Sequence, residues 1–71
     1  MSSQNFVGPE DVGARVTFRY ELPNGYVGEA VGMFVQWDDA ADAYVLTDRQ
    51  GRLVRVPRAG VTHGRIVAQP T

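Results

Sequence analysis

The fold is decided by residues 15–25, which read RVTFRYELPNG. Every second residue from Val16 to Leu22 is apolar, and this period of two is typical of a strand that buries one face. The stretch ends in Pro23-Asn24-Gly25, where proline suits the second position of a type I turn and glycine can adopt a positive φ before a bulge. A strand followed by a chain reversal predicts the first hairpin of an all-β domain.

The next two segments also read as strands. Residues 26–37 carry apolar side chains on both parities, which predicts one long strand that is bent at Gly32 and belongs to both halves of a small barrel. A third strand is expected from Ala43 to Arg49, with Tyr44 and Leu46 pointing inward. The chain therefore looks like a meander of short strands.

The last segments complete the barrel. Gln50-Gly51 predicts a two-residue hairpin turn of the primed type, and Arg52 to Pro57 predicts the fourth strand. Arg58-Ala59-Gly60 is too short for an α-helix, so we expect a single 3₁₀ turn there, before a last strand around Arg65 to Ala68. The predicted fold is all-β: a small five-stranded SH3-like barrel with a single 3₁₀ turn before the last strand.

A chain of 71 residues has room for one small core and no second one. Residues 1–13 are expected to form an N-terminal tail in which Phe6 and Val7 can pack on the barrel. The SH3-like barrel domain is predicted to cover residues 14–68. Residues 69–71 read as a C-terminal tail or the start of a linker.

The amino-acid composition limits the classes of protein to which the chain can belong. Apolar residues make up 44% of the chain and charged ones 21%, which is typical of a folded domain. There is no cysteine, no apolar run long enough to span a bilayer and no signal-type N-terminus, so we expect a cytoplasmic protein without a membrane partner. The basic residues are all arginine, as a GC-rich genome tends to encode. The net charge of −1 gives a weak long-range field, which disfavours nucleic acid as a partner.

The sequence marks no catalytic, cofactor or metal site. Asp38, Asp39 and Asp42 lack the alternating acidic pattern and closing glutamate of a calcium loop, so a solvated loop is expected. His63 is the only histidine, and no nucleophile or orienting carboxylate is marked beside it. No glycine-rich phosphate-binding loop occurs. We therefore predict no bound cofactor and a domain that is not an enzyme by itself.

Exposed arginines and aromatic residues form a candidate contact surface. Two arginines share the outward face of the first strand and two more lie late in the chain, and they would form a basic strip if those strands were neighbours. Such a strip could touch phosphates or pair with acids on an adjoining domain. Exposed tyrosine and tryptophan are favoured at interfaces, although the tryptophan could instead cap the core, and the motif of polyproline-binding SH3 domains is missing. The candidates are Arg15, Arg19, Tyr26, Trp37, Arg55 and Arg58.

Several motifs together span most of the chain: Gly13-Ala14-Arg15-Val16, Arg19-Tyr20, Leu22-Pro23-Asn24-Gly25, Val31-Gly32, Trp37-Asp38 and Val56-Pro57-Arg58-Ala59-Gly60-Val61. The order of these motifs resembles the N-terminal SH3-like domain of actinobacterial N-acetyltransferases of the GNAT superfamily. Asn24, where an aspartate is commoner, and a longer acidic loop depart from that pattern.

In relatives of this kind the barrel precedes the domain that binds acetyl-coenzyme A. The resemblance therefore implies a non-catalytic module for domain docking or protein interaction, whose partner is an acetyltransferase domain or another protein. Two alternatives stay open at this point. One is a small barrel that binds nucleic acid, and the other is an enzyme fragment whose barrel borders the active site of a second domain.

Overall fold

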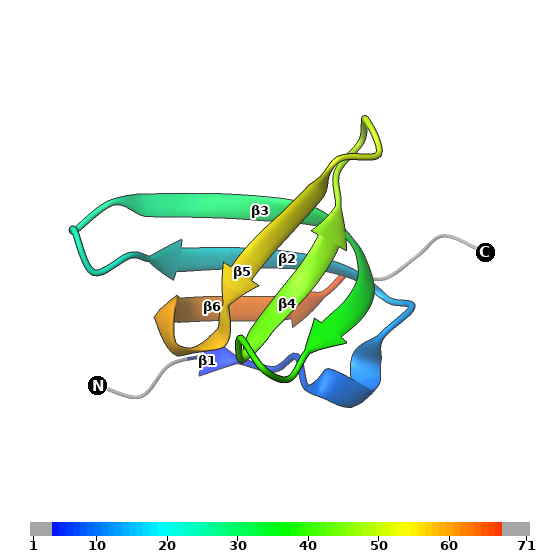
Figure 1. Ribbon diagram of the computed structural model, residues 1–71, viewed down its shortest axis with the longest axis horizontal. Helices are drawn as coiled ribbons and strands as arrows, with labels where there is room; N and C mark the ends of the chain where they lie inside the picture. Colours follow the sequence, from blue (N-terminus) through cyan, green and yellow to red (C-terminus); the bar gives the residue numbers. More distant parts are fainter. Residues whose placement is uncertain (1–3, 68–71) are drawn as a thin grey trace.

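The computed structural model describes residues 4–67, which form one strongly curved sheet without an α-helix in that range. The strands are β1 (Gln4–Asn5), β2 (Arg15–Glu21), β3 (Val27–Asp38), β4 (Ala43–Thr47), β5 (Leu53–Pro57) and β6 (Val61–Ile66), and the 3₁₀ turns are η1 (Pro9–Asp11) and η2 (Arg58–Gly60). Their spatial order is β1-β6-β2-β3-β4-β5. Figure 1 shows β3 running beside β2 and then curving sharply into β4. The all-β class, the barrel and the 3₁₀ turn before the last strand are confirmed.

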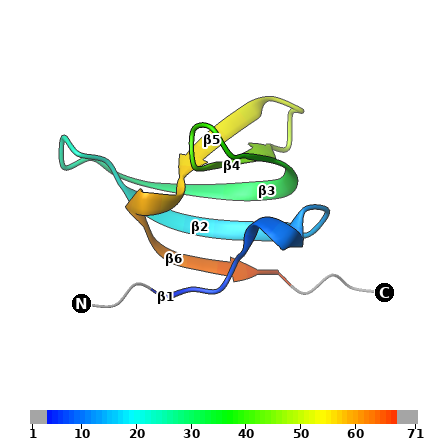
Figure 2. The same ribbon diagram turned by 60° about the horizontal axis from the view of Figure 1, so that its bottom comes forward.

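The N-terminal segment adds to the five predicted strands. β1 pairs in parallel with β6, and Figure 2 shows it lying along β6 at the edge of the sheet. Val7 is buried in the core, whereas Phe6 is exposed. Residues 4–13, assigned to a tail from sequence, thus contribute a strand, the turn η1 and one core side chain. A strand of two residues is too short to show a periodicity in the sequence.

The first hairpin turn has the predicted geometry. The Gly25 amide donates to the Leu22 carbonyl oxygen at 2.9 Å, and Gly25 has a φ of 87°. The Asn24 side chain accepts from the amide of Tyr26 at 2.9 Å, which stabilises the same reversal. A type I turn followed by a left-handed glycine therefore joins β2 to β3.

The primed turn predicted at Gln50-Gly51 is wrong. Such a turn needs a positive φ at Gln50, and the only non-glycine residue with a positive φ among residues 4–67 is Asp42. The Gly51 amide instead donates to the Asp48 carbonyl oxygen at 3.0 Å, and the Asp48 carboxylate accepts from the amides of Gln50 and Arg52. Asp48 thus caps a turn like that of the first hairpin, with Gly51 in the left-handed position.

β3 changes its buried parity as predicted, but not at Gly32. Phe34 pairs with Leu46 and Gln36 with Val45, so Val35 is the extra residue of a bulge. Gly32 has another role, because a Cβ at this position would collide with the backbone carbonyl oxygen of Thr47. Gly32 thus permits β3 and the end of β4 to approach closely, and Val35 is the extra residue of the bulge.

The last strand begins earlier than predicted. β6 runs from Val61 to Ile66, so His63 lies inside it and not before it, and Ala68 falls outside the described residues. A register shift opposite Arg19 and Tyr20 interrupts the pairing of β6 with β2. Gly64 is buried, and a Cβ there would press on the ring of Phe18. The bulge and the small residue hide the alternation of this strand in the sequence.

The turn η2 closes the end of the barrel. Pro57 ends the edge strand β5, where a missing amide removes no ladder bond. The next amide, that of Arg58, donates to the Asp42 carbonyl oxygen at 3.0 Å. Gly60 then packs so close to the end of β2 that a Cβ would lie 2.6 Å from the Glu21 carbonyl oxygen. The 3₁₀ turn is therefore held against both β2 and the loop after β3.

Tyr44 is the centre of the core. Its ring is fully buried and lies 4.5 Å from Phe18, 5.3 Å from Phe34 and 5.2 Å from Trp37, measured between ring centroids. The inward positions predicted for Tyr44 and Leu46 are confirmed. Tilted and edge-on contacts of this kind stabilise a core beyond the area that they bury.

The Tyr44 hydroxyl ties the N-terminal segment to this core. It donates to the Val7 carbonyl oxygen at 2.6 Å and accepts from the Asn5 side-chain nitrogen at 2.9 Å. The Asn5 side-chain oxygen in turn accepts from the Val7 amide at 3.0 Å. Every polar atom of this small network has a partner, so β1 is held by specific bonds as well as by burial.

Candidate functional site

The four arginines predicted to form a strip lie in two places. Arg15 and Arg19 lie on the exposed side of β2, as expected, while Arg55 lies on β5 and Arg58 begins η2. In the order of the sheet, β3 and β4 stand between β2 and β5. The condition for a single basic strip, that the two strands are neighbours, is therefore not met.

Arg55 and Arg58 pair with the acidic loop between β3 and β4. Arg55 lies 3.6 Å from the Asp38 carboxylate, and Arg58 donates two hydrogen bonds to Asp42, at 2.9 and 2.7 Å. These hydrogen bonds and the charge of Asp42 raise the pKa of the Arg58 guanidinium above its ordinary value. Both arginines thus face carboxylates of the same chain, Arg58 through two hydrogen bonds and Arg55 through a longer contact.

Trp37 belongs to the same region. Its ring is half-buried against Tyr44, and its indole nitrogen donates to the Asp39 carboxylate at 3.3 Å. Trp37 therefore caps one end of the core, which the sequence left as an alternative to a contact role. Within residues 4–67 the loop gathers no cluster of three or more potential metal ligands.

A second surface lies on the outward side of β6, β2 and β3, and we call it the outer face. The register places His63, Arg19 and Glu29 in one row across the three strands, and Arg65, Thr17 and Val31 in the next. Arg19 and Glu29 form an ion pair at 3.2 Å. The members of the outer face are Arg15, Thr17, Arg19, Glu21, Val27, Glu29, Val31, Met33, His63 and Arg65.

A line of valines runs along the β3 side of the outer face. Val27, Val31 and Val35 are 56%, 51% and 41% exposed, and the half-buried Met33 lies between the last two. We call these four residues the valine stripe. The outward side of an antiparallel strand is normally polar, and Glu29 is the only charged residue among the outward positions of β3 from Val27 to Val35. Glu29 separates Val27 from Val31, and from Val31 to Val35 the outward positions form an unbroken apolar line. An exposed apolar line of this kind is typical of a contact surface.

The valine stripe was not predicted from the sequence. The valines of residues 26–37 share one parity, but these residues were expected to form a bent strand with apolar side chains on both parities. The signal that the valines are exposed is the small size of Gly28, Ala30 and Gly32 on the opposite parity, since small residues fit where β3 crosses the crowded barrel interior. With small residues facing inward, the valines face outward.

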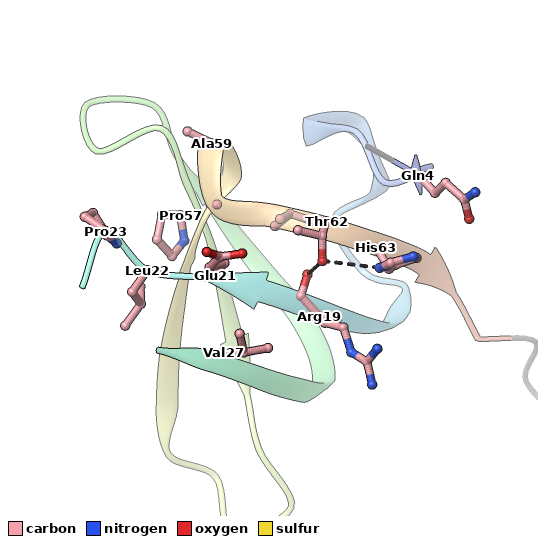
Figure 3. Close-up of a pocket in the computed structure, with 12 residues that line it drawn as sticks. Gln4, Arg19, Glu21, Leu22, Pro23, Val27, Pro57, Ala59, Thr62 and His63 are labelled. Atoms are coloured by element: carbon pink, nitrogen blue, oxygen red, sulfur yellow. Dashed lines mark hydrogen bonds between the residues drawn. The ribbon is translucent and has the colours of Figure 1, made fainter. Parts of the chain in front are cut away.

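An open groove of about 980 Å³ continues the outer face at the end nearest the first hairpin. Figure 3 shows Arg19, Thr62 and His63 side by side at one end and Leu22, Pro23 and Pro57 at the other. Its apolar walls come from Leu22, Pro23, Val27, Pro57, Ala59 and Val61. Val27 belongs both to the groove and to the valine stripe, so the two form one surface.

The last sequence candidate is Tyr26, which does not line this groove. It follows the first turn directly, it precedes the groove residue Val27, and it is 60% exposed. The structure therefore brings Arg15 and Arg19 to the outer face, leaves Tyr26 exposed after the first turn, and gathers Trp37, Arg55 and Arg58 at the acidic loop.

Comparison with known protein families gives a match over most of the chain. The family described as the Rv0428c N-terminal Sm-like domain matches residues 10–67, which is most of the chain. Neither a curated protein nor a solved structure was found to match. Within residues 4–67 there is also no helix with the length and apolar character that crossing a membrane requires.

Proposed function

The chain belongs to the family of the Rv0428c N-terminal Sm-like domain, and on this premise we propose that it is a non-catalytic β-barrel module that docks onto another protein domain. The observation that carries the proposal is the exposed valine stripe on a barrel whose interior is otherwise filled by its own side chains. Removing a row of exposed aliphatic side chains from water is favourable in free energy, so a partner that covers them is stabilised by the contact.

Two further points support a role beside another domain. The family description places the Sm-like domain at the N-terminus of Rv0428c, so in that protein it precedes further chain. The resemblance of this chain to the N-terminal barrel of GNAT acetyltransferases suggests that the neighbour is an acetyltransferase domain. The module would then position or stabilise that domain and contribute no chemistry of its own.

The contacts of His63 favour a non-catalytic role. His63 Nδ1 lies 3.2 Å from the Thr62 hydroxyl, and that hydroxyl donates to the Arg19 carbonyl oxygen. A hydroxyl that already donates its proton can only accept from the imidazole, so His63 is not placed to activate Thr62 as a nucleophile. The Thr62 hydroxyl thus links β6 to the backbone of β2.

The pairing of the arginines favours protein over nucleic acid as a partner. Arg19, Arg55 and Arg58 each lie within ion-pair distance of a carboxylate of this chain. Binding to phosphates would have to break these pairs, and the net charge of −1 provides little attraction in return.

Two titrations of the isolated chain test the proposal against its alternatives. We expect no binding of acetyl-coenzyme A by calorimetry, because a pyrophosphate needs converging amides at a helix N-terminus and residues 4–67 contain no α-helix. We also expect single-stranded RNA to bind no more tightly than millimolar at physiological salt. Micromolar affinity for the cofactor would indicate an enzyme, and micromolar affinity for RNA that falls steeply with salt would indicate a nucleic-acid-binding barrel.

A further inference from the structure

We infer that the outer face receives a protein surface that combines aliphatic side chains with carboxylates. This inference rests on the proposed docking function and specifies the chemistry of the partner. The aliphatic part of the partner would cover the valine stripe, and its carboxylates would face the arginines that border the stripe.

The charges on the outer face indicate which charge the surface of the partner should carry. Arg15 is paired with Met33 in the register, and Arg65 lies in the row of Val31 with Thr17 between them. Neither arginine has a carboxylate within ion-pair distance among the described residues. Arg19, by contrast, already pairs with Glu29. The end of the outer face that carries Arg15 and Arg65 is therefore positive, although the chain as a whole carries a net charge of −1.

A hollow on the same face has room for a carboxylate. It measures about 300 Å³, and Arg65, Arg19, His63 and Glu29 line it above the backbone of Gly64. Glu29 already pairs with Arg19, so Arg65 is the guanidinium in this hollow that is left for a carboxylate of the partner. Guanidinium groups bind carboxylates through paired hydrogen bonds, and such bonds are stronger once water is excluded by a neighbouring apolar contact. The hollow and the valine stripe lie on adjacent strands, so one partner surface can engage both.

The partner is distinguished from a nucleic acid by the apolar half of the surface. A phosphate backbone would pair with Arg15 and Arg65 but would leave Val27, Val31 and Val35 in water. Bases could stack on aromatic side chains, yet the exposed residues of the stripe are aliphatic. A protein surface with both carboxylates and aliphatic side chains can pair with the arginines and also cover the valine stripe.

The test uses the full 71-residue chain and two synthetic amphipathic peptides, followed by amide chemical shifts. One peptide carries leucines and glutamates, and its twin has a lysine in place of every glutamate. We expect the acidic peptide to shift residues of β2, β3 and β6 on the outer face and to bind at least about tenfold more tightly than its twin.

Paired charge reversals identify the arginines responsible. The double variant Arg15→Glu and Arg65→Glu should weaken the acidic peptide at least about tenfold. The control Arg49→Glu and Arg52→Glu makes the same change in net charge on exposed arginines of the β4–β5 turn, and it should alter affinity by less than about twofold.

Equal affinity for the two peptides, no binding of the acidic one, equal losses in both double variants, or shifts confined to the acidic loop would each overturn the inference. Tighter binding of a single-stranded oligonucleotide than of the acidic peptide would overturn it as well. If the acidic peptide fails but docking occurs through another surface, the proposed function stands and only the assigned partner chemistry is lost.

Discussion

Replacing Phe18 with alanine should lower the free energy of unfolding by about 3–5 kcal/mol. Phe18 is 1% exposed, and its ring lies 4.5 Å from that of Tyr44, so the truncation opens a cavity at the centre of the core. A domain of this size has a total stability at the low end of about 5–15 kcal/mol, so the variant should be partly or wholly unfolded at room temperature. Urea denaturation followed by circular dichroism measures the loss.

The matched control for Phe18 is Val31→Ala. Val31 lies on the neighbouring strand but is 51% exposed, and its truncation should change stability by no more than about 0.5 kcal/mol. A Phe18→Ala variant that unfolds at the same denaturant concentration as the parent would mean that the faces of β2 have been assigned the wrong way round.

The second large effect is expected from Gly32→Ala. A single methyl group at this position would collide with the Thr47 carbonyl oxygen, which is backbone and cannot rotate away. Separating β3 from β4 to make room should cost about 3 kcal/mol, at the upper end of what overpacking costs. Amide shifts in the variant should spread to Thr47 and Asp48, the residues that must move.

The comparison for Gly32 is Gly51→Ala. Gly51 has a φ of 79°, and a Cβ at this position would have no heavy atom within 4 Å, so its substitution meets only the penalty for a left-handed residue. That penalty is about 1–2 kcal/mol, and the shifts should stay within the turn. If Gly51→Ala proves the more destabilising of the two, the close approach of β3 to β4 is wrong.

The parts of the fold that local chemistry dictates were predictable from sequence. The alternation from Val16 to Glu21 and the glycine that ends the first turn are properties of neighbouring residues, and both lie where the sequence places them. The 3₁₀ turn after Pro57 follows from the missing amide of proline and from a segment too short for an α-helix. Such features need no knowledge of what the rest of the chain does.

The wrong predictions concern positions whose conformation is set by contacts with a segment that is distant in the sequence. Gly32 was expected to carry the bulge because glycine commonly does, but the bulge lies at Val35, and Gly32 is needed to clear Thr47. β1 was missed because its two residues gain their order from β6 and from the Tyr44 hydroxyl, which is 37 residues from Val7 in the chain. The local sequence pattern does not indicate either contact.

The candidate site was predicted in part for the same reason. The outward placement of Arg15 and Arg19 follows from strand parity alone, whereas the pairing of Arg58 with Asp42 depends on how β5 returns past the acidic loop. The valine stripe was visible as a parity in the sequence. Its exposure follows from the structure, in which the small residues Ala30 and Gly32 occupy the inward side of β3 against the core.

The central claim, that a partner domain covers the valine stripe, can be tested by the solvent exposure of three valines. A soluble paramagnetic probe should broaden the methyl signals of Val27, Val31 and Val35 in the isolated chain. We would repeat the measurement in a chimera in which this chain replaces the N-terminal Sm-like domain of Rv0428c.

The control signal is Leu53, which is 69% exposed on the edge strand β5, away from β2 and β6 in the order of the sheet. In the chimera we predict that the three valines lose most of their broadening because the adjoining domain excludes the probe, while Leu53 keeps its own. Broadening of the valines that is as strong in the chimera as in the isolated chain would contradict docking through this surface.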